Sequence, residues 1–242
     1  MSTESLYREG QDYAAMGHHR EAVQAYSAAL ALDDNHWKAR FGRGLALHRL
    51  GESAAALRDL DRVVSENVMC AEAFYSRASV RFDLAALPEA LEDAETAIRL
   101  KPGYNDALYL RAITFKALGD FDRALRDFDA VLAADRDYQE AYYGRGTVHY
   151  SFEQWSDAIR DFSACLRHQP TRQGALLLRG LAYYRVGKPE KALEDLSAVI
   201  ELSPTDGAAY IRRWQVYQSM GESEKAAADL ARGQALLAAR HE

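Results

Sequence analysis

The side chains most able to do chemistry are histidines and cysteines, and their spacing assembles neither a catalytic nor a metal site. His18 and His19 are adjacent, and adjacent side chains do not share a helical face, so we interpret the pair as part of a surface turn. Cys70 and Cys165 have no cysteine or histidine at zinc-ligand spacing. His149 is interpreted as a packed side chain rather than a general base, and no motif brings serine, histidine and aspartate together. We expect no enzyme, no metal and no cofactor.

Two Gly-Arg-Gly segments, residues 42–44 and 144–146, resemble half of a phosphate-binding loop. Neither follows a strand pattern, and neither continues to a third glycine, so a backbone cradle for phosphate is not predicted. We interpret these glycines as small residues at places where two helices approach closely.

The composition is that of an ordinary globular chain: 242 residues, 48% hydrophobic and 27% charged, with a formal net charge of -6. An acidic chain disfavours sequence-independent nucleic-acid binding, which needs a basic footprint. No apolar run approaches the roughly 18 residues of a membrane-spanning helix, and the N-terminus lacks the pattern of a signal peptide. Two cysteines favour a reducing compartment. We therefore expect a cytoplasmic protein without nucleic-acid or membrane partners.

A unit of 34 residues repeats along the chain, and this period is the strongest pattern in the sequence. Arginine recurs at this step: Arg43, Arg77, Arg111, Arg145, Arg179 and Arg213. Alanine recurs at the same step: Ala22, Ala56, Ala90, Ala124, Ala158, Ala192 and Ala226. With Thr3 as position 1, the seven predicted repeats are 3–36, 37–70, 71–104, 105–138, 139–172, 173–206 and 207–240. We expect a single domain of residues 3–240.

Each repeat is predicted to contain two helices. In the fourth repeat Leu108, Ala112 and Phe115 share one helical face. Gly119 is expected to end that helix in a C-cap turn, and a second apolar pattern runs over residues 124–132. Glycine recurs at this turn in five repeats, whereas the third and fifth repeats have Ala85 and Glu153 there.

The repeats resemble the tetratricopeptide repeat family. Its pattern has a large residue at position 4, a small one at 8, an aromatic at 11, alanine at 20, an aromatic at 24, a small residue at 27 and proline at 32. The fifth repeat matches with Tyr142, Gly146, His149, Ala158, Phe162, Cys165 and Pro170. The resemblance extends over essentially the whole chain. It implies an all-α fold, a right-handed superhelical solenoid of seven helix-turn-helix repeats.

Position 7 is arginine and position 23 is aspartate in the second to seventh repeats. In the first repeat both are missing, because Glu9 and Ala25 stand there. Because the arginine and the aspartate occur together or are missing together, we predict an ion pair between the two helices of a repeat, such as Arg111 with Asp127. The alternative is a comb of arginines for an anionic ligand.

The resemblance also implies that positions 2, 5, 9, 12 and 13 of the first helices face a concave groove. Positions 5, 9 and 12 share one helical face, which is rich in aromatic residues here. Tyrosine suits such a groove because its ring is apolar while its hydroxyl can bond a peptide backbone. The predicted partner-binding residues are Phe41, His48, Tyr75, Phe82, Tyr109, Lys116, Tyr143, Tyr150 and Tyr184. The alternative is that the position-5 rings pack against the neighbouring repeat.

The predicted groove carries mixed charges, with Glu72, Asp106 and Glu140 at position 2. A partner segment with apolar residues and interspersed Lys or Arg is expected to fit better than an acidic tail. The family's chaperone-binding members hold a C-terminal carboxylate with a set of Lys, Asn and Arg. In the first three repeats those places hold Tyr7, Gln11, Gly42, Glu72 and Ser76, and no other three consecutive repeats supply the set.

The sequence therefore favours a non-catalytic interaction scaffold or adaptor that binds a peptide segment or protein in an aromatic-lined groove. One alternative is a structural module that assembles through its ends, including a homodimer through the C-terminal repeat with Leu230, Leu236 and Leu237. Another is a ligand-sensing regulator without an output domain of its own.

Overall fold

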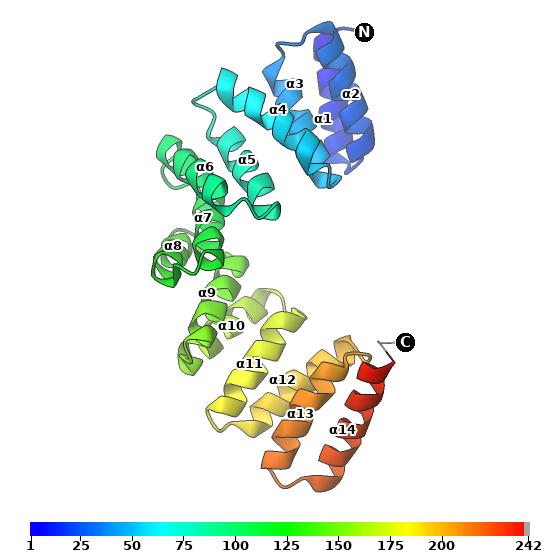
Figure 1. Ribbon diagram of the computed structural model, residues 1–242, viewed down its shortest axis with the longest axis vertical. Helices are drawn as coiled ribbons and strands as arrows, with labels where there is room; N and C mark the ends of the chain where they lie inside the picture. Colours follow the sequence, from blue (N-terminus) through cyan, green and yellow to red (C-terminus); the bar gives the residue numbers. More distant parts are fainter. Residues whose placement is uncertain (240–242) are drawn as a thin grey trace. The chain divides into compact units, whose positions relative to one another are not determined.

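The computed structural model describes residues 1–239, and over these residues the chain is all α-helical, with fourteen helices (Figure 1). The first helices of the repeats are α1 (Thr3–Ala15), α3 (Trp37–Arg49), α5 (Ala71–Asp83), α7 (Asn105–Ala117), α9 (Gln139–Ser151), α11 (Gln173–Arg185) and α13 (Gly207–Ser219). The second helices are α2 (His19–Leu32), α4 (Ser53–Glu66), α6 (Leu87–Leu100), α8 (Phe121–Ala134), α10 (Trp155–His168), α12 (Pro189–Leu202) and α14 (Ser223–Ala238). The predicted all-α helical repeat solenoid is confirmed. Residue 240, the last of the predicted seventh repeat, lies outside the described residues.

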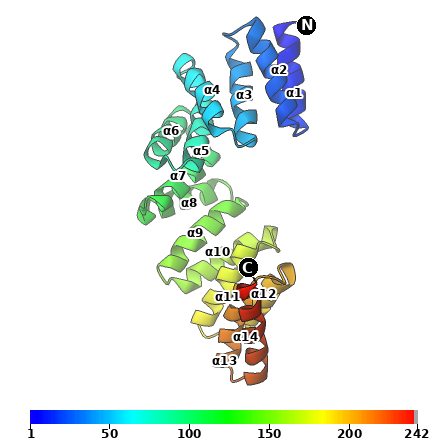
Figure 2. The same ribbon diagram turned by 45° about the vertical axis from the view of Figure 1, so that its right-hand side comes forward.

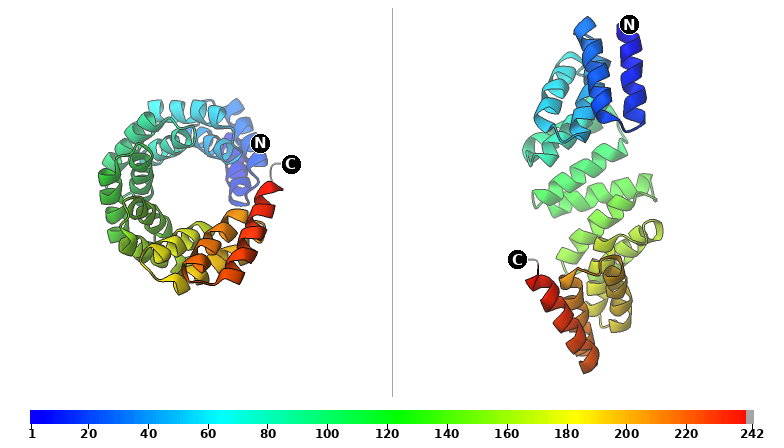
Figure 3. Two further views of the ribbon diagram at one scale, coloured as in Figure 1. Left: turned by 60° about the horizontal axis from the view of Figure 1, so that its bottom comes forward. Right: turned by 90° about the vertical axis from the view of Figure 1, so that its right-hand side faces the viewer.

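The helices form two compact units, one of residues 1–130 and one that begins at residue 131, and the boundary falls inside α8. In the first unit α1 contacts α3, α3 contacts α5, and α5 contacts α7; in the second unit α9 contacts α11, and α11 contacts α13. Among the described residues, α2, α4 and α6 contact first helices but not one another, and the same holds for α10, α12 and α14. Each unit therefore has two layers (Figures 2 and 3) and bends toward its first helices. We call the surface formed by these helices the first-helix face.

The two layers pack through small residues. Alanine at position 20 is fully buried in six repeats and 5% exposed at Ala226. Position 8 is glycine in four repeats, and a Cβ at Gly146 would lie 2.9 Å from the ring of Phe162. A larger side chain there would separate the two helices of the repeat.

The seventh repeat departs from this arrangement, because Trp214 occupies position 8. Its close approach lies instead at Gly207 of α13 and Gly233 of α14. A Cβ at either glycine would lie 2.8–2.9 Å from the other's carbonyl oxygen. The closest contact between the two helices is thus moved toward one end of α13.

The turn between the two helices of a repeat is the same in all seven repeats. The N–H of position 16 donates to the carbonyl of position 11, as in Asp120 to Phe115 at 2.9 Å and Gln154 to His149 at 2.9 Å. This bond defines a Schellman cap, which needs a left-handed residue at position 15. The five glycines have φ between 71° and 80°, while Ala85 and Glu153 adopt φ of 58° without being glycine.

The predicted ion pair between positions 7 and 23 is confirmed in all six repeats that contain both residues. In each pair the arginine Nε and Nη2 donate to the two carboxylate oxygens over 2.6–2.9 Å. The six aspartates are buried. The hydrogen bonds that Arg111 donates to Asp127 raise the pKa of Arg111, so its guanidinium stays charged at neutral pH. Because a carboxylate fills the fork of each guanidinium, these arginines are not an open comb for anions.

The same arginines also bridge to the preceding repeat. Arg43 Nη1 donates to Ser27 at 3.2 Å, Arg77 Nη1 to Asp61 at 2.8 Å, and Arg179 Nη1 to Ser163 at 3.1 Å. Ser27, Asp61 and Ser163 all stand at position 25. Arg213 makes the equivalent bond to Ser197 at 3.0 Å. One side chain thus connects three helices in two repeats.

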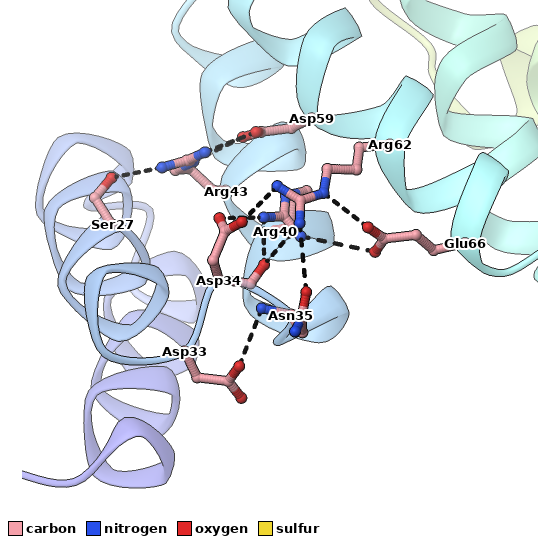
Figure 4. A network of polar contacts seen from close by, with 9 residues as sticks. All are labelled: Ser27, Asp33, Asp34, Asn35, Arg40, Arg43, Asp59, Arg62 and Glu66. Carbon is pink, nitrogen blue, oxygen red and sulfur yellow. Dashed lines mark hydrogen bonds and ion pairs between the residues drawn. The ribbon is translucent and has the colours of Figure 1, made fainter.

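A further polar network joins the first and second repeats (Figure 4), and the sequence did not indicate it. Arg40 stands at position 4, where the family has a large apolar residue, and its side chain is 3% exposed. Its Nη2 donates to Asp34 Oδ1 at 2.7 Å, and Nη1 lies 3.8 Å from Glu66. Arg62 bonds both of these carboxylates at 2.7 Å, and its hydrogen bond lowers the pKa of Asp34.

We expect Asp127→Ala to lower the free energy of unfolding by about 2–3 kcal/mol, because it leaves the half-buried Arg111 without its carboxylate. Arg126→Ala, at an exposed neighbouring position, is expected to change stability by less than about 0.5 kcal/mol. Urea denaturation of both variants measures the difference. Equal midpoints would show that the pair contributes nothing.

We expect Ala85→Gly and Glu153→Gly to stabilise the protein by about 0.5–1 kcal/mol each, because glycine adopts a positive φ without the steric penalty of a Cβ. Ala54→Gly, at an exposed position inside α4, is the matched control and should destabilise by a similar amount. Thermal unfolding followed by circular dichroism measures all three. A lower melting temperature for both turn variants would contradict this explanation.

Candidate functional site

The nine predicted partner-binding residues lie on the first helices α3, α5, α7, α9 and α11. All nine are partly buried, so each combines packing contacts with some exposed surface. Their surroundings divide them into rings that pack mainly within the protein and side chains that line open hollows.

The position-5 tyrosines pack against neighbouring elements. The Tyr143 ring lies 6.0 Å from that of Phe162, and the guanidinium of Arg172 lies 4.1 Å above it. A Cβ at Gly174 of the next repeat would be 2.7 Å from the Tyr143 hydroxyl oxygen. Tyr143 therefore fits between its own repeat and the next one.

Other position-5 rings show the same behaviour. Tyr75 lies 5.1 Å from Tyr104, and burial raises the pKa of Tyr75. Tyr109 lies 6.1 Å from Phe128 in the second helix of its own repeat. Phe41 packs against the buried clusters of the second repeat. The packing alternative for these rings is therefore correct in part.

At position 12 the side chains vary more. Phe82 packs against a buried cluster that includes Ala78 and Leu110. Burial lowers the pKa of Lys116 by desolvating its ammonium group. His48 Nε2 lies 2.8 Å from Asp83 Oδ2 of the next repeat, and the Tyr150 ring meets Trp155 edge-on at 5.0 Å.

The first-helix face of the first unit has a hollow between neighbouring helices, which we call the α3–α5 hollow. Its volume is about 330 Å³, and it is lined by Leu45, His48, Arg49, Tyr75, Ser76, Ser79 and Asp83. It brings together His48 and Tyr75 from the predicted set. It contains one carboxylate, Asp83, which lies beside His48, and one guanidinium, Arg49.

The second unit has a larger hollow on its own first-helix face, which we call the α9–α13 hollow. Its volume is about 460 Å³, and it is lined by Tyr150, Leu181, Tyr184, Arg185, Arg212, Trp214, Gln215 and Gln218. It brings together Tyr150 and Tyr184 from the predicted set. Phe41, Phe82, Tyr109, Lys116 and Tyr143 line neither hollow.

Several lining residues were missed by sequence reasoning. Trp214 and Arg212 were not predicted to face a partner. For Trp214 a signal was present, since a tryptophan interrupts the series of small residues at position 8. For Arg212 the signal was weak: it stands at position 6, an arginine position of the family's carboxylate clamp, but the rest of the clamp set is missing.

Among the described residues, the histidine and cysteine side chains that could take part in catalysis do not form a reaction centre. His149 is packed, with Nδ1 2.6 Å from Gln154 Oε1 and Nε2 3.7 Å from Asp161, which already holds Arg145. Burial raises the pKa of the Cys165 thiol, which keeps it protonated and weakly nucleophilic. His18 precedes α2 and stacks on Tyr13, as expected for a turn.

The described residues contain no group of three or more His, Cys, Asp or Glu side chains placed to hold a metal ion. None of the described helices is long and apolar enough to cross a membrane.

We expect Tyr143→Ala to lower the free energy of unfolding by about 3 kcal/mol, because it opens a void between two repeats. Tyr184→Ala should lower it by about 1 kcal/mol, since that ring lines an open hollow where water can replace it. Chemical denaturation of both variants measures the difference. Equal losses would contradict the division into packed and lining rings.

Comparison with known proteins agrees with the fold. The family model for the tetratricopeptide repeat matches residues 7–64, 49–105, 109–159 and 145–207. No curated protein matches the sequence significantly.

Many solved structures share the fold at low identity. A tetratricopeptide repeat protein from Parabacteroides merdae is 22% identical, with a TM-score of 0.71 over 97% of this chain and 93% of that one. MamA from Desulfovibrio magneticus is 23% identical, with a TM-score of 0.67 over 71% and 97%. YrrB, a protein of the same kind described as having an unusual peptide-binding site, is 21% identical, with a TM-score of 0.62 over 77% and 96%. These likenesses show the fold alone, whereas the family model covers most of the sequence, and the chain therefore belongs to the tetratricopeptide repeat family.

Proposed function

We propose that the protein is a non-catalytic adaptor that binds peptide segments of a protein partner on its first-helix faces. The observation that supports this most directly is the pair of hollows, one in each unit, lined mainly by positions 5, 9, 12 and 13 of neighbouring first helices, with Ser76, Arg212 and Trp214 from positions 6 and 8. Positions 5, 9, 12 and 13 are those from which a groove was expected. The predicted set of nine residues stays part of the proposal, with His48, Tyr75, Tyr150 and Tyr184 as the members that line a hollow.

The chemistry of the hollows suits an extended peptide. Their volumes fall within the roughly 300–1,000 Å³ of small binding pockets, and each combines aromatic surface with hydrogen-bonding groups. Packed helices lie about 8–10 Å apart, and an extended chain advances about 3.3 Å per residue. About every third residue of a peptide would then meet the next first helix, as in recognition by aromatic-lined grooves.

The family and its structural relatives support the same class of function. A related fold in YrrB is described as carrying a peptide-binding site. The low cysteine content favours the cytoplasm as the place where the adaptor works.

Self-association through the C-terminal repeat is the second candidate. Leu237 on α14 is 36% exposed, and both its side chain and that of Leu236 lie beside Gly207. Light scattering over a range of concentrations separates the two candidates. If the measured mass stays that of a monomer at every concentration, self-association is excluded and binding in the groove remains.

We expect affinity capture from a lysate of the source cells to retain a partner with the wild type and to lose it with Tyr150→Ala plus Tyr184→Ala. Two rings that line a hollow in this way commonly contribute about 1–3 kcal/mol each to binding, so the loss should exceed about tenfold.

The matched control is Leu32→Ala plus Leu202→Ala, which removes exposed apolar side chains from second helices. Both double variants must first show the helicity and mass of the wild type. If the same proteins bind all three forms, the second-helix side or the ends carry the function, and the groove proposal is wrong.

A further inference from the structure

The α9–α13 hollow differs from the α3–α5 hollow in its charge. Its lining includes two arginines and two glutamines but no aspartate or glutamate. The α3–α5 hollow contains Asp83, which pairs with His48 inside the hollow. The expectation that a partner with Lys or Arg fits best therefore does not extend to the second unit.

Arg185 and Arg212 form no ion pair with any residue between 1 and 239. Other arginines of this unit behave differently: Arg145, Arg179 and Arg213 each hold a buried aspartate. Arg185 lies 5.8 Å from the Trp155 ring, and Arg212 reaches only the side-chain oxygen of Gln215, at 3.5 Å. Both guanidinium groups thus keep their fork available for a carboxylate.

Apolar surface lies beside these two cations. Trp214 contributes to it, and it can stand at position 8 because the closest contact of α13 with α14 is at Gly207 and Gly233. Tyr150, held edge-on by Trp155, and Tyr184 add two more rings. An acidic residue next to an apolar one would place its carboxylate on arginine and its neighbour on a ring.

Gln215 and Gln218 complete the hollow. They are three residues apart on α13, so they lie on one face of the helix. Each amide offers both a donor and an acceptor, which matches the alternating N–H and C=O groups of a peptide backbone. The hollow therefore holds partners for a side-chain carboxylate, an apolar side chain and a main chain.

We infer that the α9–α13 hollow binds a peptide segment through an internal aspartate or glutamate next to an apolar residue, with Arg185 and Arg212 on the carboxylate. This inference rests on the proposed function and names the ligand chemistry of one of its two hollows. An internal acidic residue fits better than a C-terminal carboxylate. The clamp positions of the last three repeats hold Tyr143, Thr147, Leu178, Ala208 and Arg212, and only the last is a cation.

The test is selection of random peptides on the full chain, with each peptide displayed between spacers so that no free carboxyl terminus is present. We expect the selected pool to be enriched in Asp and Glu beside Leu, Phe or Tyr. Arg185→Gln plus Arg212→Gln should weaken the recovered peptides by at least about tenfold, since it removes two charge-assisted contacts. Replacing Glu by Gln in a recovered peptide should weaken it by a similar factor.

Arg167→Gln plus Arg232→Gln is the matched control, because it removes the same charge from exposed positions on α10 and α14. It should leave binding unchanged. Equal weakening by both double variants would show a general charge effect and overturn the assignment, as would a pool rich in Lys and Arg. Peptides that are lost with Tyr150→Ala plus Tyr184→Ala but are indifferent to both arginine variants would overturn the acidic ligand and keep the groove. Failure to recover any peptide sensitive to the tyrosine variants would overturn both.

Discussion

The ion pair between position 7 and position 23 is the interaction on which the repeat arrangement depends. A guanidinium has five donors in one plane, and here two of them hold the carboxylate of the same repeat. In Arg43, Arg77, Arg179 and Arg213 a third donor reaches position 25 of the preceding repeat, as Arg43 does to Ser27. A lysine could not make this set of contacts, because its ammonium group has no rigid fork. The first repeat has Glu9 and Ala25 in place of the pair.

The second constraint is the close packing of the two helix layers. It determines which aromatic rings are packed between repeats and which keep surface for a partner. Buried alanines and glycines bring the two layers together, and large rings then fill the spaces between repeats. Tyr26 illustrates this, because a Cβ at Gly10 or at Gly42 would lie only 2.6 Å from an atom of its ring. Burial raises its pKa to about 12. A ring placed in this way stabilises the contact between repeats and has little surface left for a partner.

The fold and the ion pairs were predictable from sequence because both follow from the period. Three features repeat many times: apolar residues at helical spacing, a turn residue at position 15, and the joint occurrence of Arg and Asp. One exception therefore does not hide any of these patterns. The candidate site was predictable only in part. Period and family pattern place Tyr143 and Tyr184 on first helices, but whether a ring packs or stays open depends on its neighbours, such as Gly174 beside Tyr143. The contacts of Arg40 and Trp214 were not predictable: each visibly departs from the residue type that the pattern expects, but its new contacts depend on the local packing.

These constraints also explain why the two hollows differ in charge while the fold stays the same. Positions 7, 8, 20 and 23 are committed to packing and ion pairs in nearly every repeat, so their residue types hardly vary. Positions 12 and 13 are not held to one residue type: His48 and Tyr184 differ at position 12, and Asp83 and Arg185 differ at position 13. At position 8 of the seventh repeat, Trp214 replaces the usual small residue. Its side chain adds apolar surface to a hollow that also contains two arginines without an ion pair to a described residue. The two hollows therefore differ through residues whose replacement leaves the helix contacts intact, and the ligand preference that we propose for them rests on these residues.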